Sequence, residues 1–149
     1  MQSKEMKAVV QRVKEASVTV GEVKQRIGRG LVILLGVGKA DSSAKVKWLA
    51  EKILNLRIFP DENSKMNLSA LDIKSEVLIV SQFTLYGDCR KGRRPDFTSA
   101  GPPEMAKNLY FQFVEEISKS GLVTKSGEFG AEMLVDIHND GPVTLVIEN

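Results

Sequence analysis

The densest group of uncharged polar side chains in the sequence is the stretch SQFTLYGD, residues 81–88. Ser81, Gln82 and Thr84 follow an apolar stretch, and their hydroxyl and amide groups supply hydrogen-bond donors and acceptors without charge. Such groups suit the lip of a pocket, where they would orient a substrate and stabilise an oxyanion. They equally suit a strand end whose backbone groups are satisfied by nearby hydroxyls, and the residues alone leave both interpretations open.

The sequence allows few nucleophilic or metal sites, because it contains very little histidine and cysteine. The chain has one cysteine, Cys89, and one histidine, His138. A disulfide within the chain and a usual Cys/His zinc site are therefore excluded, and a Ser-His or Cys-His pair would have to use His138. A histidine at a strand end is more typical of a structural role, and no second feature supports Cys89 as a nucleophile. We expect neither a metal nor a cofactor.

A second cluster, CRKGRRP at residues 89–95, is strongly basic. Its glycine and proline predict a shaped loop rather than a helix face. Four positive charges in such a loop could neutralise RNA phosphates, although most charge runs are simply solvated. The candidate phosphate contacts are Arg90, Lys91, Arg93 and Arg94.

Length and composition predict one globular domain. The chain has 149 residues, 42% of them hydrophobic and 27% charged, and its net charge is only +2. This charge is too small to indicate nucleic-acid binding, so any RNA contact must come from local clustering. The start lacks a targeting segment, and the longest apolar run, Leu31–Leu35, is far below the ~20 residues of a membrane span. We expect a soluble, cytoplasmic protein.

The pattern of apolar residues predicts an α/β fold, a single β-rich domain with two main helices packed on one face of a sheet. One domain covers residues 1–149, with residues 1–5 as a short extension. The first helix follows the N-cap candidates at 41–43 and the second runs from 102–103 to 120–121. Strands are predicted at residues 7–13, 16–20, 23–27, 31–37, 57–59, 76–83, 133–138 and 142–147.

The last predicted strand begins with an unusual pair, Gly141-Pro142, in the stretch NDGPVT. Proline removes a backbone donor and is normally kept out of strand interiors. Together, SQFTLYGD and NDGPVT resemble the two signatures of the D-aminoacyl-tRNA deacylases, also called D-tyrosyl-tRNA deacylases. MKAVVQRV, IGRGLVILLGVGK, WLAEKILNLRIF, RKGRRPDFT and FGAEM are also similar to that family. Departures are mild: Gly87 stands where alanine is more usual, and His138 precedes the second signature.

The resemblance implies a homodimeric hydrolase that cleaves the ester between a D-amino acid and the 3′-terminal adenosine of tRNA. The active site would lie at the subunit interface, where the Ser81–Leu85 segment of one subunit meets a cis Gly141-Pro142 of the other. Arg12 matches an arginine that braces this motif. The residues implied in catalysis are Gln82, Phe83 and Thr84, and those implied in substrate binding and chiral selection are Ser81, Leu85, Gly141, Pro142, Arg12 and Met133.

Backbone atoms of a Gly-Pro pair could read chirality, because parallel carbonyl groups would bind the ammonium group and clash with a side chain on the wrong face of Cα. Many D-amino acids and mischarged glycyl-tRNA should then be accepted, whereas L-esters should be rejected. Thr84 is one candidate nucleophile, but it needs a base. The alternative is that the terminal ribose 2′-OH activates water while backbone N–H groups near Phe83 and Thr84 hold the oxyanion.

Two other functions compete with this interpretation. The basic cluster at residues 89–95 and the apolar stripes of the two predicted helices alone fit a non-catalytic RNA-binding module equally well. A general esterase is disfavoured, because the sequence contains no G-x-S-x-G nucleophile elbow.

Overall fold

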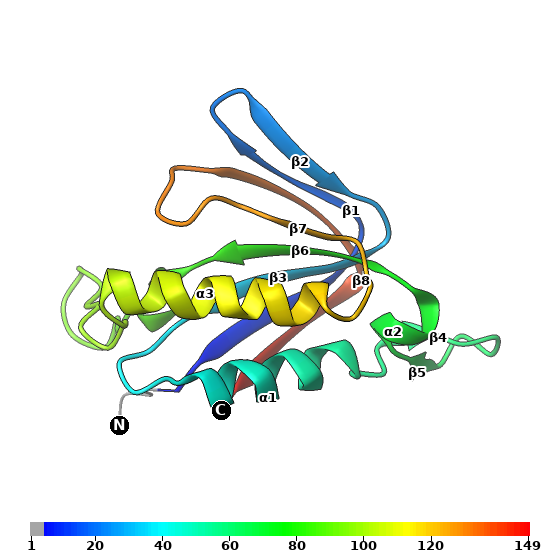
Figure 1. The fold of residues 1–149 in the computed structure, drawn as a ribbon, viewed down its shortest axis with the longest axis horizontal. Coiled ribbons are helices and arrows are strands. Elements are labelled where there is room, and N and C mark those ends of the chain that lie inside the picture. Colours follow the sequence, from blue (N-terminus) through cyan, green and yellow to red (C-terminus); the bar gives the residue numbers. More distant parts are fainter. Residues whose placement is uncertain (1–4) are drawn as a thin grey trace.

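The computed structural model describes residues 5–149, in which a six-stranded mixed sheet lies beside a two-stranded one (Figure 1). The predicted extension, residues 1–5, lies outside the described residues except for Glu5. Strands follow the order β2-β1-β3-β6-β7, and β8 pairs with β1. The β3–β6 and β6–β7 pairs are parallel. The strands are β1 Lys7–Val20, β2 Val23–Ile27, β3 Gly30–Gly36, β4 Phe59–Pro60, β5 Met66–Leu68, β6 Glu76–Ser81, β7 Thr124–Ser126 and β8 Leu134–Glu148.

The two strands predicted at 7–13 and 16–20 are wrong as separate elements, because β1 runs through both. Its first half pairs with β3 and its second half with β2 on one side, while β8 follows it on the other. The intervening polar pair, Lys14 and Glu15, falls at an irregularity in the β1–β8 register rather than at a turn. The long strand therefore passes from one part of the core to another.

The strands predicted at 133–138 and 142–147 are likewise one strand, β8. Asn139 pairs with Val13 and Thr144 pairs with Gln11, so Arg12 alone lies opposite the four residues from Asp140 to Val143. The Gly-Pro pair thus belongs to a bulged loop inside a strand, where the missing proline donor breaks no ladder bond.

Two apolar clusters hold the sheet, one on each face of its centre. On the helix side, Leu31, Ile33 and Leu35 of β3 pack with the buried residues of the helices. On the opposite side, Val32 packs with Val18 of the second half of β1 and with other buried residues. The run LVILLGV is therefore buried apart from Leu34, because the second half of β1 covers the face that the helices leave open.

The two main helices are confirmed: α1, Ser43–Leu54, and α3, Pro103–Ser118. They lie side by side across one face of the sheet (Figure 1). A short helix that was not predicted, α2 at Ala70–Ile73, begins at a capping box between Ser69 and Asp72. No helix in the described part of the chain is long and apolar enough to cross a membrane.

Smaller differences concern strand ends. β6 stops at Ser81 instead of continuing to residue 83, and the strand predicted at 57–59 is the two-residue β4. β5 lies in a stretch for which no strand was predicted, and β7 was not predicted either.

Candidate functional site

A pocket of about 490 Å³ opens where β6 ends, beside the start of α3 and the segment before β8. Of the residues singled out in the sequence, Ser81, Gln82, Phe83 and Met133 line it, whereas Thr84 and Leu85 do not. The remaining lining residues are Val37, Val80, Ala100, Gly101, Pro103, Ala106, Phe129, Gly130, Ala131 and Val135. The pocket is largely apolar, with its few polar groups at the end of β6, which is the usual pattern of a small-molecule site.

The polar lip is formed where β6 turns into a 3-10 helix, Phe83–Tyr86. The Gln82 N–H donates to the Leu35 carbonyl at 2.8 Å, which extends the sheet by one residue before the backbone turns. The Gln82 side-chain amide donates to the Thr84 hydroxyl. A carboxamide cannot take up a proton, so this contact orients the Thr84 hydroxyl without activating it.

Tyr86 anchors the 3-10 turn from below. Its side chain is buried, and its hydroxyl contacts the carbonyls of Gly36, at 3.2 Å, and Glu5. Burial raises the pKa of Tyr86 well above its ordinary value, so the phenol stays a hydrogen-bond donor. The Lys7 ammonium lies 5.1 Å from the Tyr86 ring centre and 3.5 Å from the Leu85 carbonyl. These contacts fix the turn against the end of the sheet.

The opposite wall of the pocket depends on Tyr110, which the sequence placed only in a helix stripe. Its buried hydroxyl lies 3.0 Å from the Ile79 carbonyl and 3.1 Å from the Gly127 carbonyl, and thus joins β6 to the segment before β8. Burial raises the pKa of Tyr110 to about 12. Its ring also lies 5.8 Å from that of Phe129, centre to centre. Tyr110 therefore holds the pocket-lining segment in place.

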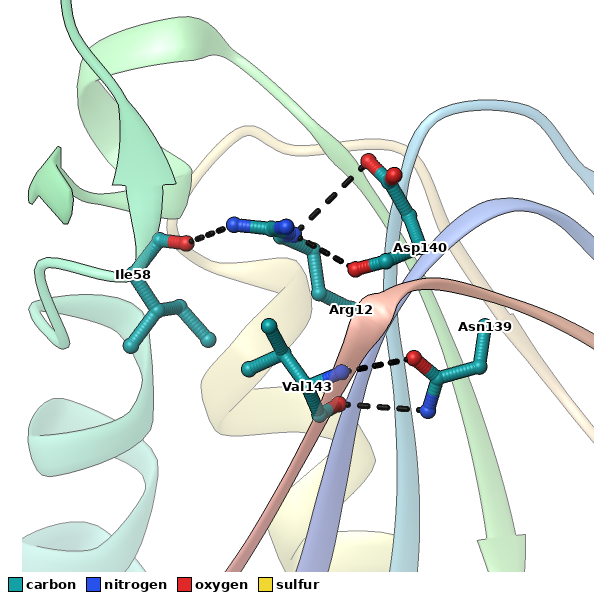
Figure 2. Close-up of polar contacts among 5 residues, drawn as sticks. All are labelled: Arg12, Ile58, Asn139, Asp140 and Val143. Atoms are coloured by element: carbon teal, nitrogen blue, oxygen red, sulfur yellow. Dashed lines mark hydrogen bonds and ion pairs between the residues drawn. The ribbon is translucent and has the colours of Figure 1, made fainter. Parts of the chain in front are cut away.

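The second motif forms the loop Asp140–Val143, which we call the braced loop (Figure 2). Asn139 closes it: its side-chain oxygen accepts from the Val143 N–H at 2.7 Å, and its amide donates to the Val143 carbonyl at 3.2 Å. The Asn139 side chain thus pairs with Val143 as a neighbouring strand would. The Gly141-Pro142 peptide bond is cis, as the resemblance implied.

Arg12 supports the same loop from β1 (Figure 2). Its Nε donates to the Asp140 carbonyl at 3.0 Å and its Nη1 donates to the Ile58 carbonyl at 2.7 Å. The Asp140 carboxylate lies 3.7 Å from Nε, and the Arg12 side chain is only 11% exposed. One guanidinium therefore ties the braced loop to both β1 and the segment before β4.

Within one chain, the braced loop and the pocket lie far apart. Ser81 pairs with Leu35 on β3, whereas Arg12, opposite the braced loop, pairs with Leu31. Four residues along the strands and three strand spacings across the sheet separate the two segments by on the order of 20 Å. Neither Gly141 nor Pro142 lines the pocket.

The segment Asp88–Asp96, which we call the basic loop, is closed at its base. The backbone groups of Asp88 and Asp96 exchange two hydrogen bonds, at 2.7 and 2.9 Å. The Arg90 guanidinium is engaged within the loop, because it donates to both carboxylate oxygens of Asp88 at 2.9 and 2.7 Å. The remaining basic residues, Lys91, Arg93 and Arg94, are exposed.

His138 and Cys89 lie away from the pocket lining. His138 has Glu15 at 3.5 Å from Nδ1 and Asp136 at 3.4 Å from Nε2. Cys89 is exposed in the basic loop. Neither residue gives the pocket a nucleophile or a general base.

Comparisons with known proteins give a consistent result. The family model described as D-Tyr-tRNA(Tyr) deacylase matches residues 9–148. A D-aminoacyl-tRNA deacylase of Thermosipho africanus is 59% identical over 97% of both chains, and one of Syntrophobacter fumaroxidans is 55% identical over the same shares.

Two solved structures are also similar. One, titled c-Myc DNA Unwinding Element Binding Protein, has a TM-score of 0.89 and 47% identity over 96% of this chain and 98% of that one. The other, a probable eukaryotic D-amino acid tRNA deacylase, has a TM-score of 0.85 over 97% of this chain and 100% of that one. At 18% identity, the second structure supports the fold alone.

Proposed function

The chain belongs to the D-Tyr-tRNA(Tyr) deacylase family, and from this premise we propose that its pocket and its braced loop are two halves of one ester-cleaving site. Its activity is hydrolysis of the ester that joins a D-amino acid to tRNA. The observation that carries the proposal is the distance between the two signature motifs. Each is held by its own hydrogen bonds, yet the two lie on the order of 20 Å apart within one chain.

A symmetric dimer would bring the halves together. In a two-fold assembly, a contact between surface A and surface B of two chains occurs twice. The pocket of each subunit would then receive Gly141 and Pro142 of the partner, which are exposed in the single chain. We assign two such sites to a homodimer that acts on aminoacyl-tRNA in the cytoplasm.

The pocket would hold the terminal adenosine and the ester. Its volume of about 490 Å³ suits a nucleoside-sized ligand, and Met133 and Phe129 offer apolar contact to a base. Ser81 and Gln82, which line the pocket, and Leu85 of the adjoining 3-10 turn would then border the aminoacyl group.

The partner's braced loop would select the amino acid's configuration. Arg12 and Asn139 hold its backbone at both ends, so a clash with an L side chain could not be relieved by movement of the loop. Glycine, which has no side chain to exclude, would be cleaved as well. D-amino acids of many kinds would be accepted, because selection acts at Cα.

Hydrolysis would use the substrate's own 2′-OH. Water would attack the ester carbonyl carbon, and the 2′-OH would relay a water proton to the leaving 3′ oxygen as the ester C–O bond breaks. The products would be the free D-amino acid and tRNA with a 3′-OH. Backbone N–H groups at Phe83 and Thr84, the first of the 3-10 turn, would stabilise the oxyanion. The contact between the Thr84 hydroxyl and the Gln82 amide, which is not a base, supports this route over attack by Thr84.

Thr84→Ala and a terminal 2′-deoxyadenosine separate the two mechanisms. We expect Thr84→Ala to keep kcat within about fivefold, and the 2′-deoxy substrate to lose about 10²-fold or more, the usual contribution of a proton-transferring group. Single-turnover deacylation of D-tyrosyl-tRNA measures both. An inactive but folded Thr84→Ala variant would restore the nucleophile.

Mixing two impaired variants tests the shared site. Ala131→Trp fills the pocket, and Gly141→Ala adds a methyl group where φ is +138° and a Cβ would lie 2.8 Å from Val143 Cγ2. Each variant alone should cleave D-tyrosyl-tRNA poorly, whereas mixed dimers contain one intact site. Random mixing should restore about a quarter of wild-type activity, because half of the dimers carry one good site of two.

One control substrate and two contrary results complete this test. L-tyrosyl-tRNA should remain uncleaved throughout. No recovery in mixtures whose subunits demonstrably exchange would place the whole site in one chain. RNA binding by the wild-type protein without cleavage of either ester would leave a binding module only.

A further inference from the structure

Two aromatic rings lie together at the edge of the pocket, which Phe83 lines and Phe97 does not. Phe83, in the 3-10 turn, is 57% exposed although it is large and apolar. Phe97 meets it edge to face, with ring centres 5.3 Å apart. Phe97 also packs tightly on the turn, because a Cβ on Gly87 would lie 3.0 Å from both the Phe97 ring and the Thr84 carbonyl. Glycine at position 87 therefore gives the pair its room.

The same segment of chain joins this pair to the basic loop and to the pocket. The basic loop ends at Asp96, immediately before Phe97. The backbone hydrogen bonds between Asp88 and Asp96 therefore hold the base of the loop next to the aromatic pair. Beyond Phe97, Gly101 donates to the Val37 carbonyl at 2.8 Å, and both of these residues line the pocket. The exposed cations, the aromatic pair of exposed Phe83 and half-buried Phe97, and the pocket thus follow one another along this segment.

We propose that Phe83, Phe97 and the tip of the basic loop form a second subsite, which binds the single-stranded nucleotides immediately 5′ of the terminal adenosine. This inference rests on the proposed function, since it takes the adenosine to occupy the pocket. A base would stack on the aromatic pair, and the phosphates would meet Lys91, Arg93 and Arg94. Arg90 is left out of the phosphate contacts, because Asp88 already binds its guanidinium at two points.

This arrangement has the two elements that proteins use for single-stranded nucleic acid. Aromatic side chains stack on bases whatever the sequence, and a neighbouring positive surface binds the backbone. The single-stranded 3′ end is common to all tRNAs, so a sequence-tolerant subsite would suit an enzyme that acts on many of them. Three phosphate contacts would give a slope of about −2 for log K against log salt on a single strand.

Two substrates separate this subsite from the pocket: D-tyrosyl-tRNA, and D-tyrosyl-adenosine, which lacks the preceding nucleotides. The variants are Phe97→Leu and the double variant Arg93→Gln/Arg94→Gln. Each should lower kcat/KM for D-tyrosyl-tRNA about tenfold and leave D-tyrosyl-adenosine unchanged, as loss of one stacked base or of two phosphate contacts predicts. The double variant should also make the salt slope shallower by about 1.4.

Two variants that each remove one cation serve as controls. Arg90→Gln removes a cation from the same loop and should leave the salt slope unchanged, since this guanidinium serves Asp88. Lys24→Gln removes an exposed cation from β2 and should change neither substrate.

The outcomes distinguish the two proposals. Equal losses on both substrates would overturn the subsite and reduce Phe97 to a support of the turn. A Phe97→Leu variant that weakens subunit association and slows both substrates would assign the rings to the dimer interface instead. Unchanged cleavage of D-tyrosyl-tRNA by every variant would also overturn the subsite. Failure of the wild-type protein to cleave either ester would instead refute the proposed function.

Discussion

The basic loop and the braced loop each contain an aspartate-arginine ion pair, but the pair has a different structural role in each loop. Each contains an aspartate bound by an arginine, Asp88 by Arg90 and Asp140 by Arg12. In the basic loop the arginine is two residues away in the chain and 63% exposed. In the braced loop it comes from another strand, is 11% exposed, and binds main-chain carbonyls of two separate segments.

The difference shows what each loop can offer a substrate. An exposed pair within one loop gives little stability, so the loop can adjust while its other side chains contact a ligand. A largely buried arginine that links three segments fixes the backbone itself. The basic loop therefore presents side chains and the braced loop presents main-chain atoms, which is the feature that the proposed selection of configuration requires.

Removal of Arg12 should have the largest effect. Arg12→Met leaves the Asp140 and Ile58 carbonyls without their donor, and hydrogen bonds to charged groups contribute about 1.5–3 kcal/mol each. We expect the free energy of unfolding to fall by about 3 kcal/mol and D-tyrosyl-tRNA cleavage by at least about tenfold. Urea denaturation and single-turnover kinetics measure the two effects.

Arg12→Lys is the matched variant, because it keeps the charge but not the forked donor. If the bracing matters, Arg12→Lys should lose activity nearly as much as Arg12→Met while remaining folded. Full activity of Arg12→Lys would mean that charge near Asp140 is sufficient.

Asn139→Asp should have an intermediate effect. The carboxylate can still accept from the Val143 N–H, but it cannot donate to the Val143 carbonyl or to Thr144 Oγ1, which lies 3.0 Å from the amide. We expect a loss of about 1–2 kcal/mol in unfolding free energy, measured by urea denaturation. Asn63→Asp, in an exposed turn, is the isosteric control. Equal stability of the two variants would show that the Asn139 donor contributes nothing.

Much of the architecture follows from local patterns, but the braced loop does not. The stripe from Val46 to Leu54 and the run LVILLGV predict a helix and a buried strand, because each pattern depends only on residues close in the chain. Asn139-Asp140-Gly141 reads locally as a turn between two strands. The strand resumes beyond it because Thr144 pairs with Gln11, a contact between opposite ends of the chain.

The residues of the candidate site likewise differ in whether local sequence could predict them. Ser81 and Gln82 were visible as polar residues after an apolar run, and both line the pocket. Tyr110 was visible only as part of a helix stripe, because its role depends on carbonyls of β6 and of the segment before β8. The capping box of Ser69 and Asp72 was present in the sequence and could have predicted α2.

The smallest effect is expected at Asp88, and it concerns the pKa of the Asp88 carboxyl rather than the free energy of unfolding. Hydrogen bonds from the Arg90 side chain, and then from its backbone N–H, lower the pKa of Asp88 from 3.8 to about 2. A lowered pKa means that the folded state favours the ionised carboxylate over the protonated form. Any contribution of this group to the stability of the fold is therefore complete above pH 3.8 and is lost as the pH falls through about 2. Carbon NMR of the Asp88 carboxyl should therefore give a midpoint near 2.

Arg90→Ala sharpens the contrast with Arg12. The Asp88 pKa should return only part of the way to 3.8, because the backbone N–H of residue 90 still donates to the carboxylate at 3.0 Å. Stability at neutral pH should not change measurably, since the pair is exposed. A midpoint that stays near 2 would mean that the backbone N–H alone lowers the pKa of Asp88. A large loss of stability would mean that the basic loop, like the braced loop, is held by its arginine.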